Sequence, residues 1–376
     1  MNPIKILHVL GGIFRYGGTE TFIMNYYRHI DRSKVQFDFI VHGFEKGVYD
    51  DEIAQLNGKI YNVPIKSKDY FGNIRALKMI FNSGEYKIVH SHMDAMGMVA
   101  LKTAKKCGIP IRIAHSHNTD HQTSNKVQYA LHELARKQIK QYATHLFACS
   151  EAAGRWLYGE EAIKQDNFRI IKNAIDYDSF CFNEDKRNQI RAELHIRDNL
   201  VIGHIGRFSE QKNHLFLLDI FNELLKIKPS ARLILIGDGH LKQQIEDKII
   251  ELNIIGSVHL LGLRSNTNEL INAFDIFLLP SLYEGLPVVL TEAQANGLQC
   301  FISDNITKEA GLLNKITYIP LSDPPAKWAE IICASYDEHK TRIITKKELV
   351  STGYEITTAT ASLQDFYISS IALGNK

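Results

Sequence analysis

Short apolar runs rich in β-branched residues alternate with longer amphipathic stretches through the first half of the chain. A short apolar run between turn-forming residues predicts a strand, whereas apolar residues at helical spacing predict a helix. The predicted strands span residues 4–10, 35–41, 87–91, 111–115, 144–148 and 168–171, and the predicted helices span 19–29, 95–106 and 126–141. Repeated strand–helix units indicate a parallel sheet with helices on both faces.

The same alternation restarts near residue 200, after a polar stretch between 176 and 198 in which the periodicity lapses. Strands are predicted at 200–205, 232–236, 258–261 and 276–279, and helices at 213–226, 241–252, around Glu269 and at 287–296. We therefore predict two tandem, doubly wound, Rossmann-like α/β domains, residues 1–180 and 181–354, with a cleft between them. A last helical pattern, 357–371, lies in a C-terminal segment, 355–376, for which we consider a return to the first domain.

Composition adds a few limits on the class of protein and its compartment. A chain of 376 residues is long enough for two cores, and no apolar run approaches the roughly 18–20 residues that span a bilayer. The start of the chain, MNPIKILHVLGG, is typical of a first strand rather than of a signal peptide. The five cysteines are scattered and never spaced C-x-x-C, which fits reduced thiols and predicts a cytoplasmic protein.

Charge is spread unevenly along the chain. The net charge is +2, made up of +6 over residues 1–180 and −4 over the remainder. A basic first half would suit an anionic acceptor or peripheral contact with the inner face of an anionic membrane. A chance scatter of solvated charge explains it equally well, and both alternatives stay open.

A glycine-rich loop follows the first predicted strand and contains Gly11, Gly12, Gly17 and Gly18. Glycines let backbone amides approach a phosphate, and the helix that follows adds a favourable dipole at its N-terminus. The loop is not G-x-G-x-x-G, and only Glu45 follows the second strand, which argues against a dinucleotide-dependent dehydrogenase. We predict that Gly17 and Gly18 contact phosphate; a tight turn without a ligand is the alternative.

The loop at residues 206–213 places Arg207 and Lys212 between a predicted strand and a helix whose N-cap is predicted to be Asn213. The planar fork of arginine and the point charge of lysine together suit a diphosphate. A solvated loop is the alternative, but ligands of open α/β sheets bind at such strand ends. The loop is therefore predicted to bind phosphate.

Two carboxylates, Glu284 and Glu292, are separated by seven residues near the last strongly predicted helix. With Pro287 in the first turn, Glu292 falls in the second turn. Carboxylates accept hydrogen bonds from sugar hydroxyls, and backbone amides near a helix start, such as those of Gly285 and Leu286, suit phosphate. A pair of helix caps would lie within one turn, which this spacing exceeds.

Two H-x-H sequences, His90/His92 and His115/His117, end adjacent predicted strands. The period of two places each pair on one face of its strand. Such pairs could bind zinc, but no nearby Cys or carboxylate set completes a ligand shell. We therefore predict no metal site.

Taken together, Gly206-Arg207…Lys212 and Glu284-x7-Glu292 resemble the retaining glycosyltransferases of family four, which have the GT-B fold. The opening Lys5–Val9, the loop Tyr16–Glu20 and the segment Ile171–Asp176 resemble further motifs of that family, so that the resemblance covers nearly the whole chain. The stretch Arg112–Asn118 resembles bacterial capsule and exopolysaccharide enzymes. Departures from the family pattern, which bear on donor specificity, are Ala174, Gln294 and Asn296.

The resemblance implies that the second domain binds a nucleotide diphosphate-sugar, with UDP-sugar expected, and that the first binds a glycan or polyprenyl-linked acceptor. It implies that Arg207 and Lys212 hold the diphosphate, Glu292 the ribose hydroxyls and Glu284 the transferred sugar. It also implies that a histidine borders the reacting sugar; His117 is favoured, and His115 is the alternative. No nucleic acid partner is expected.

Retention of configuration could proceed through a carboxylate nucleophile. The resembled family implies front-face attack instead, in which the leaving diphosphate takes the proton of the acceptor. Side-chain cations and glycine-loop amides would then stabilise the developing charge without a metal cofactor. Two other classes are kept: a nucleotide-sugar epimerase with Glu284 or Glu292 as acid and base, and a non-catalytic protein that binds nucleotide sugar. The presence of both cations and both glutamates weighs against the second of these.

Overall fold

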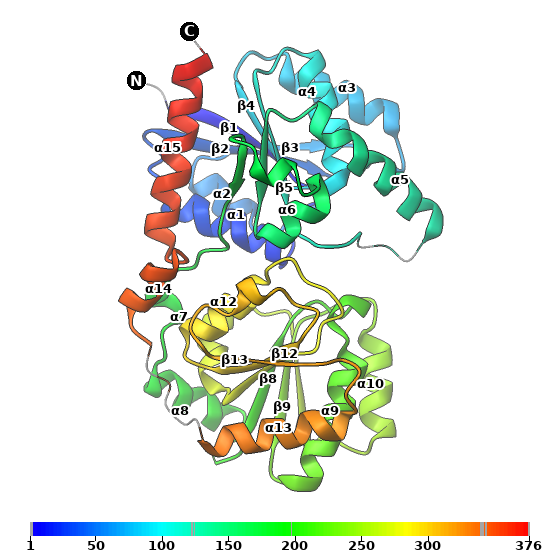
Figure 1. Ribbon diagram of the computed structural model, residues 1–376, viewed down its shortest axis with the longest axis vertical. Helices are drawn as coiled ribbons and strands as arrows, with labels where there is room; N and C mark the ends of the chain where they lie inside the picture. Colours follow the sequence, from blue (N-terminus) through cyan, green and yellow to red (C-terminus); the bar gives the residue numbers. More distant parts are fainter. Residues whose placement is uncertain are drawn as a thin grey trace. The chain divides into compact units, whose positions relative to one another are not determined.

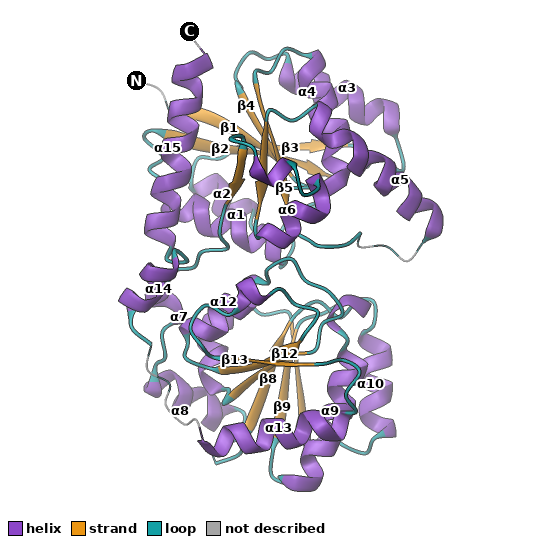
Figure 2. Ribbon diagram, in the orientation of Figure 1, coloured by secondary structure: helices purple, strands orange, loops and turns teal. Residues whose placement is uncertain are grey.

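The computed structural model describes residues 3–121, 123, 125–196, 198–338, 342 and 344–374. The chain divides into two compact units, Met1–Ala174 with Ile356–Lys376, and Ile175–Glu355. The division falls a few residues before the predicted position at 180, because the backbone N–H of Ile175 already donates to the carbonyl of Tyr354, in the second unit. Each unit holds one parallel sheet between helices (Figures 1 and 2), which confirms the predicted fold class.

The first unit contains a seven-stranded sheet in the order β3-β2-β1-β4-β5-β6-β7. All neighbouring strands run parallel. Its strands are β1 (Ile4–Val9), β2 (Val35–His42), β3 (Ile60–Val63), β4 (Ile88–Ser91), β5 (Ile111–Ser116), β6 (His145–Ala148) and β7 (Phe168–Ile170). The strand order reverses between β1 and β4, which makes their carboxyl ends the topological switch point.

Helices cover both faces of this sheet. They are α1 (Gly18–His29), α2 (Asp50–Gln55), α3 (Tyr70–Phe81), α4 (Met98–Lys106), α5 (Lys126–Gln138), α6 (Glu151–Tyr158) and α15 (Ile356–Gly374). One face packs on α3, α4 and α6 around Leu77, Leu101 and Leu157. The other face packs on α1 and on the C-terminal helix α15, which lies along the sheet of this unit in Figure 1.

The second unit contains a six-stranded sheet in the order β10-β9-β8-β11-β12-β13. Its strands are β8 (Val201–Ile205), β9 (Arg232–Ile236), β10 (Val258–Gly262), β11 (Ile276–Leu279), β12 (Gln299–Ser303) and β13 (Ile316–Ile319). Its helices are α7 (Tyr177–Phe180), α8 (Glu184–Glu193), α9 (His214–Ile227), α10 (Lys242–Glu251), α11 (Thr267–Leu270), α12 (Val288–Ala295), α13 (Pro325–Glu338) and α14 (Lys346–Thr352). Phe221 and Trp328 lie in the core on one face, and Phe274 lies in the core on the other.

The predicted strands and helices are all present, with ends that differ by a few residues. The periodicity missed the strands β3, β12 and β13, among other elements. The edge strands β3 and β13 are short and only partly buried, so their sequences lack the continuous apolar run that marks the central strands.

Candidate active site

The loop 206–213 leaves the carboxyl end of β8, at the centre of the second sheet. Phe208 anchors it by inserting its ring into the core. Gly237, at the end of β9, permits the close packing of this loop, since its φ is +152° and an added Cβ would lie 2.0 Å from the carbonyl oxygen of Gly206. The sequence reasoning did not single out Gly237, although its position at a strand end was a signal.

Lys212 and Glu284 form an ion pair at this strand end. Lys212 Nζ lies 2.5 Å from Glu284 Oε1, and the two side chains are only 14% and 7% exposed. Gln211 Nε2 donates to the carbonyl of Tyr283 at 3.1 Å and to Glu284 Oε2 at 3.4 Å. The structure therefore brings the two predicted loops together and places the predicted phosphate-binding cation against the predicted sugar-binding carboxylate.

Arg207 lies in the same loop but is exposed. No carboxylate among the described residues pairs with its guanidinium. The two predicted cations thus have different surroundings, one held in an ion pair and the other in solvent.

Asn213 is the N-cap residue of helix α9, as predicted, but it does not cap the helix with its side chain. Its backbone is in the left-handed region, with φ 55°, and its side chain makes no capping hydrogen bond. The side-chain amide donates instead to the carbonyl of Pro280 at 3.1 Å. Asn213 therefore connects the 206–213 loop to the loop that carries Glu284. Asparagine suits this position because it tolerates a positive φ at low cost.

Glu292 lies in α12, which begins after Pro287. Its side chain is buried, at 5% exposure, and burial raises its pKa to about 7. No side chain or backbone donor of the described residues reaches its carboxylate. Gly285 and Leu286 occupy the short link between Glu284 and this helix. A buried carboxylate with a perturbed pKa and no donor is typical of a functional site.

The predicted phosphate loop of the first unit precedes α1, with Gly17 as its N-cap residue in extended conformation. A Cβ added at Gly12 or Gly18 would meet nothing within 4 Å. Neighbouring atoms therefore do not force a glycine at these two positions. The open space beside the backbone would let a ligand approach the amides.

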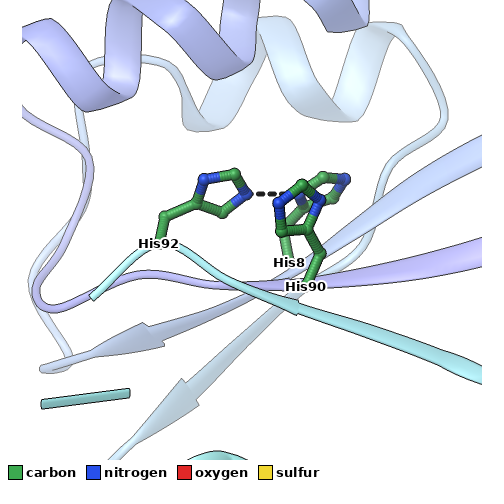
Figure 3. A group of neighbouring side chains, drawn as sticks. All are labelled: His8, His90 and His92. Atoms are coloured by element: carbon green, nitrogen blue, oxygen red, sulfur yellow. Dashed lines mark hydrogen bonds between the residues drawn. The ribbon is translucent and has the colours of Figure 1, made fainter. Parts of the chain in front are cut away.

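Five histidines cluster on the face of the first sheet that α1 and α15 cover. They are His8 on β1, His90 and His92 on and just after β4, and His115 and His117 on and just after β5. His8 Nδ1 lies 2.8 Å from His92 Nε2, and Figure 3 shows this bond with His90 beside it. His92 Nδ1 lies 3.0 Å from His117 Nε2.

The sequence reasoning predicted the two H-x-H pairs but missed His8. Its register partner in the neighbouring strand is His90, so the two side chains lie on the same face. The alternation of β1 places His8 on one face of its strand. The pairing of β1 with β4, which brings His8 beside His90, joins residues far apart in the chain and was not predicted.

Burial keeps the cluster uncharged. It lowers the pKa of His8 and of His117 to about 3, and it lowers the pKa values of His90, His92 and His115 well below the usual range. These imidazoles are therefore neutral at physiological pH. The backbone N–H of His117 donates to Asp94 Oδ1 at 2.6 Å, and this bond fixes the backbone from which the His117 side chain extends.

Two groups in this cluster, His8/His90/His92 and His92/His115/His117, bring ligand nitrogens within 4.8 Å of one another. The number of ligands by itself therefore does not exclude a metal, since three imidazoles suffice for some zinc sites. The distances between these nitrogens weigh against a zinc ion. The His8–His92 and His92–His117 nitrogens are 2.8 and 3.0 Å apart, shorter than the about 3.3 Å that two ligands of one tetrahedral zinc ion require.

Two tandem Rossmann-like domains, with charged side chains gathered at the carboxyl ends of a parallel sheet, are the architecture of the GT-B fold, which is a fold of glycosyltransferases. The chain belongs to this family: residues 16–179 match Glycosyltransferase Family 4, and residues 185–313 match Glycosyl transferases group 1.

A relative in Bacillus subtilis (strain 168), named glycosyltransferase EpsF, is 39% identical over 373 residues, which are 96% of each chain. The capsular polysaccharide biosynthesis glycosyltransferase CapH of Staphylococcus aureus is 24% identical over 97% of this chain and 99% of the relative. Among solved structures, Anabaena Alr3699/HepE in complex with UDP and glucose has a TM-score of 0.78 at 19% identity, and covers 97% of this chain and 100% of its own. This likeness shows the same fold.

Proposed function

We propose that this glycosyltransferase moves a hexose from a UDP-sugar to a glycan or polyprenyl-linked glycan, with retention of anomeric configuration, in capsule or exopolysaccharide synthesis. The observation that carries the proposal is the buried Lys212–Glu284 pair beside the helix that holds Glu292. One cation and one carboxylate thus meet at the carboxyl end of a parallel sheet, where α/β domains bind nucleotides, and a second carboxylate lies in the helix that follows. The name of the relative CapH and the UDP and glucose bound to HepE support this substrate class.

In this proposal Lys212 and Arg207 bind the diphosphate of the donor. Glu292 accepts hydrogen bonds from the ribose hydroxyls, and its unpaired, buried carboxylate suits that role. Glu284 binds the transferred sugar, while the amides of Gly285 and Leu286 lie beside the phosphates. Catalysis is then chiefly electrostatic, since fixed cations stabilise the charge that develops on the leaving diphosphate.

The first domain holds the acceptor, and His117 borders the reacting sugar. With a pKa of about 3, His117 is not a proton donor in imidazolium form at neutral pH. The ring instead forms hydrogen bonds, and the leaving diphosphate takes the proton of the acceptor. The amides of Gly17 and Gly18 add to the charge stabilisation, and no metal cofactor takes part.

The enzyme acts in the cytoplasm, at the inner face of the membrane. Helix α5 presents an exposed apolar stripe, Val127, Leu131 and Leu134, flanked by the exposed Lys126 and Lys137. An apolar stripe with basic residues beside it suits the surface of an anionic bilayer. Of the helices described, none is both long and apolar enough to cross a membrane.

Sedimentation with lipid vesicles tests this contact. The full chain is expected to bind vesicles that contain phosphatidylglycerol more than vesicles of phosphatidylcholine alone, and Leu131→Glu is expected to weaken binding. Ile250→Glu, on an exposed position of α10, is the matched control. Equal loss with both variants, or no binding by the native chain, would remove the membrane contact from the proposal.

The transfer itself is tested with a panel of UDP- and GDP-sugars labelled in the sugar. Release of free nucleotide that depends on a glycan or polyprenyl-linked acceptor, with the label in the product, supports transfer. The anomeric configuration of the product, measured by NMR, decides between retention and inversion. An altered sugar that remains on the nucleotide would identify an epimerase and contradict the proposal.

A further inference from the structure

Three imidazoles form a hydrogen-bonded row that ends at His117. His8 Nδ1 meets His92 Nε2 at 2.8 Å, and His92 Nδ1 meets His117 Nε2 at 3.0 Å. Exposure rises along the row, from 2% at His8 to 9% at His117. The row therefore runs from the core of the first domain to the residue assigned to the reacting sugar (Figure 3 shows its inner part).

Neutral imidazoles allow only two arrangements of protons in this row. Each ring carries one N–H, and each of the two hydrogen bonds needs one donor and one acceptor. If His92 carries its proton on Nδ1, it donates to His117 Nε2 and accepts from His8 Nδ1. If His92 carries its proton on Nε2, both bonds reverse, and the protons of His8 and His117 lie on Nε2.

The surroundings of His8 distinguish the two arrangements. His8 Nε2 is buried and has no hydrogen-bond partner among the described residues. In the second arrangement this atom would be a buried N–H without an acceptor, whereas in the first it carries only a lone pair. Buried N–H groups without an acceptor are rare in proteins, and rarer than buried acceptors without a donor. The first arrangement is therefore favoured.

We propose that His8 and His92 are positioning residues that hold His117 in the tautomer with its proton on Nδ1. His117 then offers a hydrogen-bond donor to its ligand, which is an oxygen acceptor such as a sugar hydroxyl. The tautomer follows from the row of imidazoles alone; only the identity of the ligand rests on the proposed function. The hydrogen bond to one ring nitrogen sets which nitrogen of a histidine carries the proton.

A second row in the same cluster serves as an internal comparison. Tyr367 Oη lies 2.7 Å from His90 Nδ1, and His90 Nε2 lies 3.0 Å from His115 Nδ1. No hydrogen bond joins this row to His117 among the described residues, although the rings of His115 and His117 stack at 4.1 Å. Removal of the Tyr367 hydroxyl should therefore leave the tautomer of His117 unchanged.

The test is NMR of the full chain labelled with ¹⁵N-histidine, in which couplings between ring nitrogens and ring carbon-bound protons identify the tautomer. The His117 signals are assigned by their absence in His117→Gln. In the native chain the Nδ1–H form is expected to exceed the Nε2–H form by roughly tenfold or more, the ratio that one unmade buried hydrogen bond implies. A native chain with the proton of His117 on Nε2 overturns the proposal, and this result needs no variant that could fail to fold.

Variants then test the part played by His8. His8→Phe removes the donor and is expected to reduce the excess of the Nδ1–H form of His117. His8→Asn is expected to preserve that excess, since its amide nitrogen takes the place of Nδ1. Tyr367→Phe is the control. An unchanged tautomer in a folded His8→Phe chain would show that His8 does not position His117.

Steady-state kinetics test whether the tautomer of His117 affects sugar transfer. His8→Phe is expected to lower kcat by about tenfold with little change in the KM of the donor, as loss of an interaction made in the transition state does. His8→Asn is expected to recover most of the rate. A folded His8→Phe chain with native kcat would show that the tautomer has no part in catalysis. NMR reports the tautomer of His117 without substrate. The tautomer assignment would therefore survive a failure of the proposed transfer, and the proposed transfer would survive a wrong tautomer assignment.

Discussion

Lys212 Nζ and Glu284 Oε1 lie 2.5 Å apart although 72 positions separate the two residues in the chain. The pair joins the loop after β8 to the loop before α12, and both side chains are largely buried. When one charged group is removed from such a pair, the other stays buried without its countercharge. The effects of substitutions at these two positions are therefore expected to be non-additive.

Lys212→Ala is expected to fold and to slow transfer by roughly 10²-fold or more, as the loss of one preorganised charge typically does. Its thermal stability should fall because Glu284 loses its charged partner, and Lys212→Ala/Glu284→Gln should recover part of that loss. Lys226→Ala, which removes an exposed pair with Glu223, is the control. Initial rates at saturating donor and thermal unfolding measure the two effects; native turnover would refute the diphosphate role.

Arg207→Lys is expected to impair transfer although it keeps the charge, because a lysine cannot make the two parallel hydrogen bonds of a guanidinium to a phosphate. Since Arg207 is exposed and has no carboxylate partner among the residues described, stability should not change. Comparison of kcat/KM with that of Arg155→Lys, an exposed surface control, measures the effect. Equal values for the two variants would argue against a bidentate contact.

Glu284→Gln and Glu292→Gln are expected to differ in their kinetics. Glu292 is assigned to the ribose, which does not react, so its loss should mainly raise the KM of the donor. Glu284 is assigned to the transferred sugar, and its hydrogen bonds to that sugar can strengthen in the transition state. Its loss should therefore mainly lower kcat and weaken discrimination among donor sugars. Steady-state kinetics with several donors separate the two. The same change in both variants, or the reverse, would contradict this division.

The pKa of Glu292 predicts how stability depends on pH. Burial raises it from 4.5 to about 7 in the folded chain, so between these values the folded state binds the proton and the unfolded state does not. Stability from this group is then present below about pH 4.5 and decreases as pH rises to 7. Glu292→Gln should therefore gain stability relative to the native chain on going from pH 5 to pH 8, by at most about 3 kcal/mol. Denaturant unfolding at the two pH values measures this; a difference independent of pH would contradict it.

Chelation is expected to leave transfer largely intact. The one D-x-D sequence of the chain lies at the start of α7, where Asp176 caps the helix and Asp178 Oδ2 accepts from Lys346 Nζ at 2.6 Å. In the histidine cluster, hydrogen bonds already join the nitrogens that a metal would need. Activity after incubation with EDTA and dialysis is the measurement. Loss that Mn²⁺ or Zn²⁺ restores would show that a metal takes part.

The sequence by itself determined the two parallel sheets, the ends of most central strands and the residues at those ends. The candidates Arg207, Lys212 and Glu284 were located by their position after a strand, and Glu292 by its place in the helix that follows; the binding roles of all four stay predictions. The reason is that hydrophobic periodicity and the position of a residue after a strand are local properties, and parallel sheets collect such positions along one edge.

Only the tertiary structure decided which of these residues meet. It paired Lys212 with Glu284 and placed His8 in the histidine cluster. It also directed the side chain of the N-cap residue Asn213 to the carbonyl of Pro280 instead of to the helix. It also buried Glu292 deeply enough to raise its pKa. These features depend on strand order and on packing between segments far apart in the chain. No local pattern contains that information, because the same periodicity is compatible with more than one order of strands.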